Sequence, residues 1–298
     1  MKHIISIRDF TREELDGLLD HARRIEQGGY AGNELAGRIL ALLFFEPSTR
    51  TRISFETAMA RLGGERISLD CVEASSIVKG ESLADTIRVI SGYADAIVLR
   101  HPKEGAARLA AEFASVPVIN AGDGAGQHPS QTLLDLYTIR EHLPLRGIEI
   151  GLLGDLRYGR TVHSLTYALS LYDVMVHAIA PEGLKLPQNV IHEMKEREME
   201  VHEWSDISKI IGDLDVLYVT RIQRERFPDA ASYYSVASSY RVTPELLAGG
   251  KPHLIVLHPL PRLDEIDPRV DSLPHARYFE QARNAVPVRM ALLKEVMG

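Results

Sequence analysis

Anion-binding residue types are concentrated in one short segment, Ser48-Thr49-Arg50-Thr51-Arg52, which carries three hydroxyls and two guanidiniums. The segment follows the apolar run 39–43 and precedes an amphipathic helical pattern over 55–62. Because the residue before a proline avoids helical geometry, the Glu46-Pro47 pair predicts that a helix begins at Ser48 or Thr49. The N–H groups and dipole of a helix start favour an anion, and phosphate suits these side chains best. An ordinary capped helix with solvated arginines is the alternative.

Composition limits the class of protein. The 298 residues suggest about two domains, and 45% hydrophobic with 25% charged residues is ordinary for a globular chain. A net charge of -7 argues against a nucleic-acid partner. Cys71 is the single cysteine, so neither an intrachain disulfide nor a cysteine-based zinc site is expected. The N-terminus lacks the apolar core of a signal peptide, and no run reaches membrane-spanning length. We therefore expect a cytoplasmic enzyme with no membrane partner.

Short apolar runs alternate with helical patterns along the chain. The predicted strands are 39–45, 67–69, 96–99, 116–119, 148–153, 174–179, 216–219 and 254–257. The predicted helices between them include 82–93, 132–142 and 161–170. Several strands are apolar on both faces, as buried parallel strands are. The pattern predicts an α/β fold of two domains, each a mostly parallel sheet flanked by helices.

Pro144 and Gly147 mark the expected boundary between the two domains. The last helical pattern has a strong apolar stripe, with Pro287 expected in its first turn. We expect this helix to return to the first domain. The first domain is therefore predicted over 1–143 and completed by 284–298, and the second over 144–283.

Polar residues follow six of the predicted strands directly. They occupy 46–50, 100–102, 120–124, 154–155, 220–223 and 258–262. Ligands of open α/β sheets bind outside the carboxyl ends of the strands. Because arginine, histidine and hydroxyl groups follow strands in both halves, we expect an anion-binding active site in a cleft between the two domains.

Two further segments leave their roles open. The polar stretch 75–82 precedes a helix and is either a solvated loop or a mobile lid that brings Lys79 to a phosphate. His128 follows the glycine-rich stretch 122–126 and could donate a hydrogen bond to a carbonyl oxygen, although a lone histidine there is more often structural. Neither a Walker A loop nor a G-x-G-x-x-G dinucleotide fingerprint occurs.

Two arginines in the second half stand apart from those of the first. Arg160 follows the strand 148–153, and Arg221 follows the strand 216–219. Each by itself is typical of an ordinary exposed side chain. Together they suit a substrate with two carboxylates, whereas a cationic substrate would not require this pair of arginines.

Seven segments, in order along nearly the whole chain, resemble the carbamoyltransferase family. They are Ser48-Thr49-Arg50-Thr51-Arg52, Lys79-Gly80-Glu81, Arg100-His101-Pro102, His128-Pro129-Ser130-Gln131, Tyr158-Gly159-Arg160, Thr220-Arg221-Ile222-Gln223 and His258-Pro259-Leu260-Pro261-Arg262. The resemblance implies that carbamoyl phosphate is bound by Ser48, Thr49, Arg50, Thr51, Ser75, Arg100, His128, Gln131, Leu260 and Pro261. It implies that aspartate is bound by Lys79, Arg160, Arg221 and Gln223. Catalytic roles are implied for Arg50, Thr51, Lys79, Arg100 and His128.

The resemblance also implies an activity and an assembly. The carbamoyl group of carbamoyl phosphate would pass to the α-amine of L-aspartate, giving N-carbamoyl-L-aspartate and phosphate in de novo pyrimidine biosynthesis. The amine would attack directly, with no covalent enzyme intermediate, no metal and no organic cofactor. The chain would form a homotrimer in which Ser75 and Lys79 reach the active site of a neighbouring subunit. The segment 103–110 resembles the one that meets a zinc-bearing regulatory chain in some relatives, or is an ordinary amphipathic helix.

Three alternative functions are weaker. Ornithine is the competing acceptor within the family, but its enzymes carry His-Cys-Leu-Pro where this chain has His258-Pro259-Leu260-Pro261. A non-catalytic binding protein on the same fold would not need both the phosphate-side and the carboxylate-side groups. A nicotinamide-dependent dehydrogenase lacks its fingerprint here.

Overall fold

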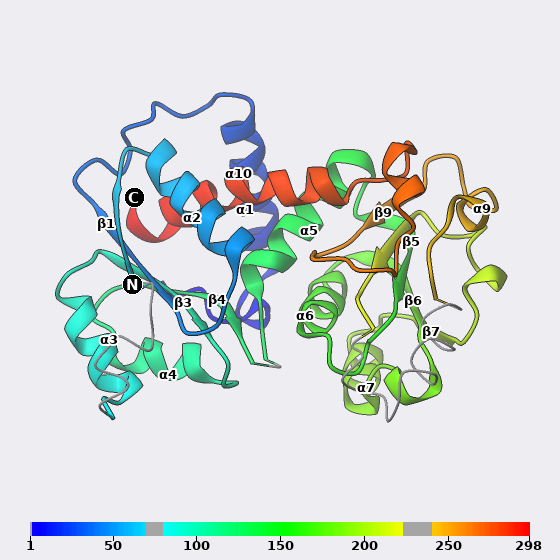
Figure 1. Cartoon of the computed structure of the whole chain (residues 1–298), viewed down its shortest axis with the longest axis horizontal. Helices are drawn as coiled ribbons and strands as arrows, with labels where there is room; N and C mark the ends of the chain where they lie inside the picture. The colour runs from blue at the N-terminus through cyan, green and yellow to red at the C-terminus, as the bar shows by residue number, and fades with distance from the viewer. Residues whose placement is uncertain (1, 70–79, 125, 223–239) are drawn as a thin grey trace. The chain divides into compact units, whose positions relative to one another are not determined.

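The computed structural model describes residues 2–69, 80–124, 126–222 and 240–298. Contacts divide the chain into two compact units (Figure 1). Unit 1 comprises Met1–Tyr137 together with Asn284–Gly298, and unit 2 comprises Thr138–Arg283. The division falls inside two helices, α5 (Pro129–His142) and α10 (Tyr278–Met297), so each helix contributes residues to both units.

Unit 1 contains a four-stranded parallel sheet in the order β2-β1-β3-β4. Its strands are β1 (Ile39–Phe44), β2 (Glu65–Leu69), β3 (Ala96–His101) and β4 (Val118–Asp123). Its helices include α1 (Arg12–Glu26), α2 (Thr49–Arg61), α3 (Leu83–Ser91) and α4 (Ala106–Phe113). In Figure 1, α3 and α4 lie on one side of this sheet, with α1, α2 and α10 on the other. The inward side chains of β1 and β3 form an apolar cluster with Ile87 of α3 and Ala107 of α4.

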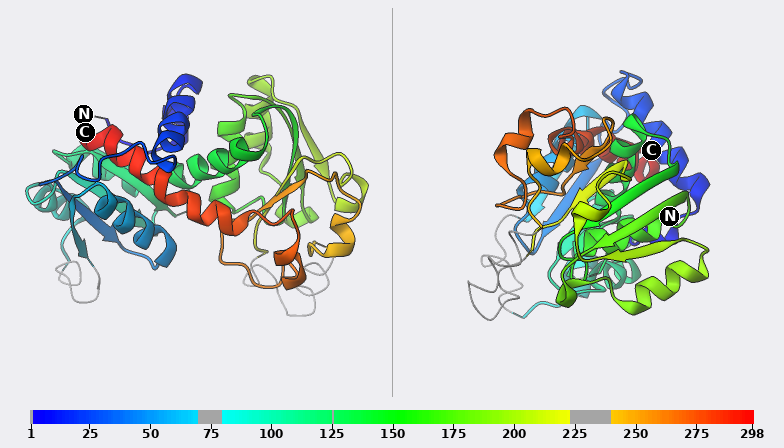
Figure 2. Two further views of the ribbon diagram at one scale, coloured as in Figure 1. Left: turned by 90° about the horizontal axis from the view of Figure 1, so that it is seen from above. Right: turned by 90° about the vertical axis from the view of Figure 1, so that its right-hand side faces the viewer.

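Unit 2 contains a five-stranded parallel sheet in the order β7-β6-β5-β8-β9. Its strands are β5 (Arg146–Leu153), β6 (Asp173–Ile179), β7 (Val201–Trp204), β8 (Val216–Val219) and β9 (Ile255–Leu257). Its helices include α6 (Arg160–Leu169), α7 (Gln188–Glu196) and α9 (Pro244–Leu247), and two turned views of the ribbon are given in Figure 2. Apolar residues of β5, β6, β8 and β9 form a continuous buried core. The predicted α/β class with two parallel sheets is confirmed.

Several features differ from the sequence-based predictions. β3 and β4 extend to His101 and Asp123, so the residues 100–101 and 120–123 form the ends of these strands and do not follow them as predicted. The edge strand β7 was not predicted, because its four residues include His202 and Glu203 and lack the apolar run of a central strand. The C-terminal helix begins at Tyr278 rather than 284, so the placement of Pro287 in its first turn is wrong. The early turns of α10 mix polar with buried residues, so they lack the apolar stripe from which the helix was predicted. Pro287 therefore lies inside the helix, where it removes one backbone hydrogen bond.

The helices of the described segments include none that is both long enough and apolar enough to cross a membrane.

Candidate active site

Each sheet has a point where consecutive connections leave in opposite directions. In unit 1 the chain adds β2 on one side of β1 and then β3 and β4 on the other. In unit 2 it adds β6 and β7 on one side of β5 and then β8 and β9 on the other. Ligands of open α/β sheets bind at such switch points, outside the carboxyl ends of the strands. The predicted arginines follow the strands that flank these two points.

The N-terminus of α2 is the first element at the switch point of unit 1. Ser48 occupies the N-cap position and Thr49 begins the helix, but the Ser48 side chain makes no capping hydrogen bond. In α1, α3 and α9, by contrast, the N-cap side chains of Thr11, Ser82 and Thr243 each accept a hydrogen bond from a first-turn N–H. The start of α2 therefore lacks the side-chain acceptor that those helices have. An anion would supply one.

The first turn of α2 presents Arg50 and Thr51 differently. Arg50 is exposed, while its partial desolvation lowers the pKa of the guanidinium below its ordinary value. Thr51 is buried, with 6% of its surface exposed. Ser54 in the next turn donates its hydroxyl to the carbonyl oxygen of Thr51 at 3.0 Å. The turn thus offers a solvent-facing cation beside a sheltered hydroxyl.

Arg100 lies at the end of β3, in register with Phe44 at the end of β1. Its Nη1 donates to the carbonyl oxygen of Ala121 at 3.1 Å, and its Nη2 forms an ion pair with the carboxylate of Glu46. Glu46 precedes the α2 start by three residues, so the ion pair joins the ends of β1 and β3. The partner of Glu46 was not predicted from the sequence. The one available indication was its position directly before the anion-binding segment.

The turn after β4 is shaped by a polar network that sequence analysis also missed. Asn120 donates to the backbone oxygen of Ile5 at 2.9 Å and to the carboxylate of Asp123 at 3.0 Å. Asp123 accepts in turn from the N–H of Gly105 at 2.9 Å. A Cβ at Gly124, whose φ is +51°, would lie 2.7 Å from the backbone nitrogen of Glu104. This close approach explains the glycine and fixes the path of the chain toward α5.

His128 and Gln131 are placed by the start of α5. Both are buried, with 4% and 9% of their surfaces exposed. The carbonyl oxygen of His128 accepts hydrogen bonds from the N–H groups of Gln131 and Thr132, at 3.0 and 3.1 Å. The Gln131 side chain donates to Asp135 at 2.8 Å. His128 therefore lies directly before the first residue of α5, where its carbonyl oxygen accepts from the first-turn N–H groups.

In unit 2 the ends of β5 and β8 meet at a glycine. Gly154 has a φ of +120°, and a Cβ there would collide with the carbonyl oxygen of Thr220. The N–H of Thr220 donates to the carbonyl oxygen of Leu153 at 2.7 Å. Arg160 begins α6 after the turn that follows β5, and Arg221 follows Thr220 directly. Both arginines thus follow the two strands that flank the switch point of unit 2.

In unit 2, Leu260 follows the end of β9, and its φ of +54° is unusual for a branched side chain. Its N–H donates to Nδ1 of His258 at 2.8 Å, and Nε2 of His258 lies 2.7 Å from the carboxylate of Glu265. The N–H of His258 donates to Gln281 at 2.8 Å. Burial acts to raise the pKa of Glu265, but the hydrogen bond from His258 outweighs it and holds that pKa below its ordinary value. The buried histidine and glutamate therefore fix the strained backbone at Leu260.

Replacing Glu265 with glutamine should lower the free energy of unfolding by about 1–3 kcal/mol, because a buried hydrogen bond to a charged group is weakened. Since the folded-state pKa of Glu265 is lowered, its contribution is complete above the unfolded-state value near 4.5 and is lost as the pH falls through the lower folded-state value. The difference in free energy of unfolding between wild type and variant, measured by urea unfolding, should therefore be full at pH 7 and should shrink at acid pH. A difference that is constant across this range would contradict the assignment.

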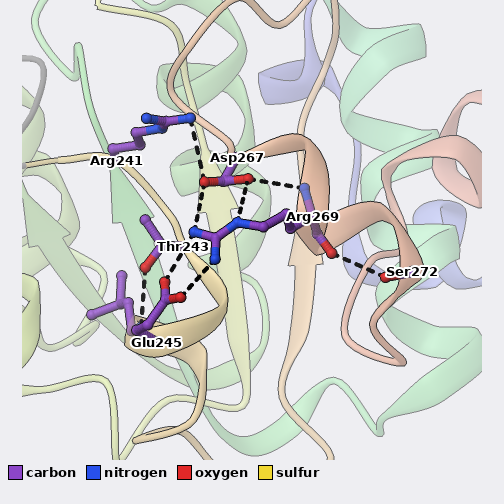
Figure 3. Close-up of polar contacts among 7 residues, drawn as sticks. Arg241, Thr243, Glu245, Asp267, Arg269 and Ser272 are labelled. Carbon is purple, nitrogen blue, oxygen red and sulfur yellow. Dashed lines mark hydrogen bonds and ion pairs between the residues drawn. The ribbon is translucent and has the colours of Figure 1, made fainter.

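A network in the same unit, in which Arg269 and Glu245 are exposed, provides the control for that prediction (Figure 3). Arg269 forms ion pairs with Glu245 at 2.8 Å and Asp267 at 3.0 Å, and Arg241 lies 3.4 Å from Asp267. Hydrogen bonds from Arg269 lower the pKa of Asp267 to about 2. Exposed ion pairs contribute little to stability because solvent screens them. Replacing Glu245 with glutamine should therefore change unfolding much less than the same change at Glu265.

Three predicted site residues, Ser75, Lys79 and Gln223, lie outside the described residues. The segment 103–110 runs through a turn into α4, which buries Ala107 and Ala110 and leaves Leu109 exposed at 41%. A cavity of about 480 Å³ lies beside it, lined by Phe45, His101 and Leu109 among others. None of the described site predictions lines this cavity.

Comparison with known proteins gives matches over both units. Residues 2–141 match the family model "Aspartate/ornithine carbamoyltransferase, carbamoyl-P binding domain", and residues 146–296 match "Aspartate/ornithine carbamoyltransferase, Asp/Orn binding domain". The aspartate carbamoyltransferase catalytic subunit of Methanoculleus marisnigri is 71% identical over 297 residues, covering 100% of each chain.

Two solved structures are similar over the full length. The catalytic subunit of M. jannaschii aspartate transcarbamoylase has a TM-score of 0.94 at 55% identity, covering 100% of this chain and 98% of that chain. Trypanosoma cruzi aspartate transcarbamoylase in complex with carbamoyl phosphate and aspartate has a TM-score of 0.92 at 40% identity, covering 100% of this chain and 96% of that chain.

Proposed function

The chain belongs to the aspartate/ornithine carbamoyltransferase family, and on that basis we propose which of its residues bind each substrate and which stabilise the transition state. The reaction is transfer of the carbamoyl group of carbamoyl phosphate to the α-amine of L-aspartate, giving N-carbamoyl-L-aspartate and phosphate. The assignment of one substrate to each unit is supported by the arginines that lie at the switch point of each sheet. Unit 1 binds carbamoyl phosphate, and unit 2 binds aspartate.

The phosphate group binds at the N-terminus of α2. Ser48, Thr49 and the first-turn N–H groups donate to its oxygens, and Arg50 and Arg100 neutralise its charge. Support comes from the missing side-chain cap at Ser48 and from the register that brings Arg100 beside the end of β1. Because Arg100 pairs with Glu46 in the described structure, phosphate binding requires Arg100 to share or exchange that carboxylate.

The carbamoyl end of the substrate is polarised by hydrogen-bond donors. Thr51, Arg100 and His128 donate to the carbonyl oxygen, where negative charge develops as the amine attacks. Such oxyanion donors are each worth about 3–4 kcal/mol in the transition state. Gln131 and the backbone at Leu260 and Pro261 orient the carbamoyl group. The buried network that fixes Leu260 supports a positioning role for this backbone.

Aspartate is oriented by its two carboxylates. Arg160 and Arg221 each bind one carboxylate, and Gln223 and Lys79 complete the set. The neutral α-amine then attacks the carbamoyl carbon, the bond from that carbon to the phosphate oxygen breaks, and the departing phosphate accepts the amine proton. The enzyme supplies no nucleophile and forms no covalent intermediate. Holding both substrates in one geometry supplies effective molarity.

Rapid mixing with carbamoyl phosphate tests direct attack. Without aspartate, the purified chain should release no burst of phosphate, because no carbamoyl-enzyme forms. With aspartate, phosphate and N-carbamoyl-L-aspartate should appear in equal amounts from the first turnover. A burst stoichiometric with enzyme in the absence of aspartate would show a covalent intermediate and overturn this mechanism.

Replacing Arg221 with alanine should mainly damage the use of aspartate, because a bidentate arginine–carboxylate contact is strong and directional. The KM for aspartate should rise at least tenfold. Carbamoyl phosphate binding, measured by calorimetry without aspartate, should change little. Arg241, an exposed arginine of the same unit, provides a matched alanine control. Loss of carbamoyl phosphate binding in the Arg221 variant would contradict the division between the units.

Assembly and location complete the proposal. The catalytic-subunit names of the relatives support a homotrimer in which Ser75 and Lys79 enter the neighbouring active site. The exposed Leu109 of α4 supports contact between the segment 103–110 and a zinc-bearing regulatory chain. We place the enzyme in the cytoplasm. Co-purification of the trimer with the product of a neighbouring gene tests the regulatory partner.

A further inference from the structure

Arg289 is the largest fully buried side chain among the described residues. It belongs to the part of α10 that lies in unit 1, and only 2% of its surface is exposed. Its guanidinium carbon lies 4.7 Å from the centre of the Phe55 ring, which projects from α2. Its Nε has no hydrogen-bond partner. No role for Arg289 was predicted from the sequence, and none of the proposed substrate contacts involves it.

The surroundings of Arg289 do not balance its charge. In the described part of unit 1, no carboxylate forms an ion pair with Arg289, and the charge that acts on its pKa is that of another cation, Arg100. Burial first, and the charge of Arg100 second, lower the pKa of Arg289 to about 9. A buried charge without a counter-ion destabilises a folded protein, and a cation–π contact recovers a small part of that loss. Retaining arginine here therefore calls for a functional reason.

Both neighbours of Arg289 lie on elements that form the proposed phosphate site. Phe55 lies on α2, the helix whose uncapped N-terminus would face the phosphate. Arg100, at the end of β3, is one of the groups that would neutralise it. The ion pair with Glu46 offsets part of the charge of Arg100 and weakens the positive potential of the site. A second guanidinium behind Arg100 restores that potential in a region where solvent screening is low.

We propose that Arg289 is a positioning residue of the phosphate site, whose buried charge makes the site at Arg100 electropositive and whose contact with Phe55 holds α2. This inference rests on the proposed function of unit 1. The bound phosphate dianion, rather than a carboxylate of the protein, compensates the charge of Arg289. The site is thus built with an excess of positive charge that lowers the stability of the empty protein and strengthens anion binding.

Replacing Arg289 with methionine separates these two effects, because methionine has similar volume and no charge. Binding of inorganic phosphate, measured by calorimetry, should weaken by about tenfold or more, because a cation is removed from the neighbourhood of the anion in a region where solvent screening is low. The melting temperature without ligand should stay the same or rise, since an unpaired buried charge has been replaced by an apolar side chain. Arg289→Lys keeps the charge and should bind phosphate within about threefold of wild type. Arg38→Met removes an exposed cation of the same unit and should leave phosphate affinity unchanged.

The outcomes are distinct. A methionine variant with a lowered melting temperature and unchanged phosphate affinity would show that Arg289 is only structural. A lysine variant that binds as weakly as the methionine variant would show that charge is not the cause, and either result overturns the inference. Should the methionine variant fail to fold, Arg289→Gln is measured in the same way against the lysine variant. Failure of the wild type itself to bind phosphate would instead overturn the proposed function of unit 1.

Discussion

Replacing Arg50 with alanine is expected to lower turnover by about a hundredfold or more, the scale of losing one transition-state donor to developing charge. Arg50 stands in the first turn of α2, where the helix start lacks a side-chain cap and the guanidinium is exposed. The fold should survive, because removing an exposed side chain opens no cavity. Steady-state turnover at saturating substrates, with circular dichroism as the check on folding, measures the effect.

Arg61 at the last turn of the same helix provides the matched control. It is exposed like Arg50 but lies at the end of α2 farthest from the proposed phosphate. Its alanine variant should retain near-normal turnover. An Arg50 variant as active as this control would remove Arg50 from the mechanism.

Mixing two inactive variants should restore activity if the active site is shared between subunits. The homotrimers of Lys79→Ala and of Arg50→Ala should each be nearly inactive. A hybrid trimer contains one site in which the Arg50 of one subunit meets the Lys79 of its neighbour, both unmodified. Mixing equal amounts should recover about a quarter of wild-type activity, because about three quarters of the trimers are hybrid and one site in three is restored. Restored sites should have near-normal affinity for aspartate.

Hybrid formation is verified by native mass spectrometry of the reassembled trimers. Wild-type trimer taken through the same dissociation and reassembly controls for losses in the procedure. Absence of recovery at every mixing ratio, with hybrids present, would show that each site is contained in one subunit. That result would overturn the shared site without affecting the assignment of the reaction.

The sheets were predictable because their central strands are apolar on both faces. The strand 216–219 was predicted with its observed bounds, and β1 to within one residue, since Phe45 already belongs to the turn. β7 was missed because an edge strand needs apolar residues on one face only, and its polar residues hide it. The start of α10 was missed because burial of Tyr278 depends on contacts in the folded unit.

The chemistry of the site was predictable at strand ends and unpredictable where partners are distant in sequence. Arg50, Arg100 and Arg221 were recognised because each directly follows an apolar run. The ion pair between Glu46 and Arg100 joins residues 54 positions apart, which only strand register brings together. Arg289 lies within the last predicted helical pattern but was not part of its apolar stripe, and its position over the ring of Phe55 could not be inferred from helical spacing.

Acceptor selectivity tests the central claim most directly, because the paired arginines of unit 2 are proposed to select a dicarboxylate. The purified chain is supplied with carbamoyl phosphate and either L-aspartate or L-ornithine, and kcat/KM is measured for each acceptor. We expect carbamoylation of aspartate to be favoured by about 10⁴-fold or more, since ornithine leaves an arginine at the site without its carboxylate. Equal use of the two amines, or a preference for ornithine, would contradict the account.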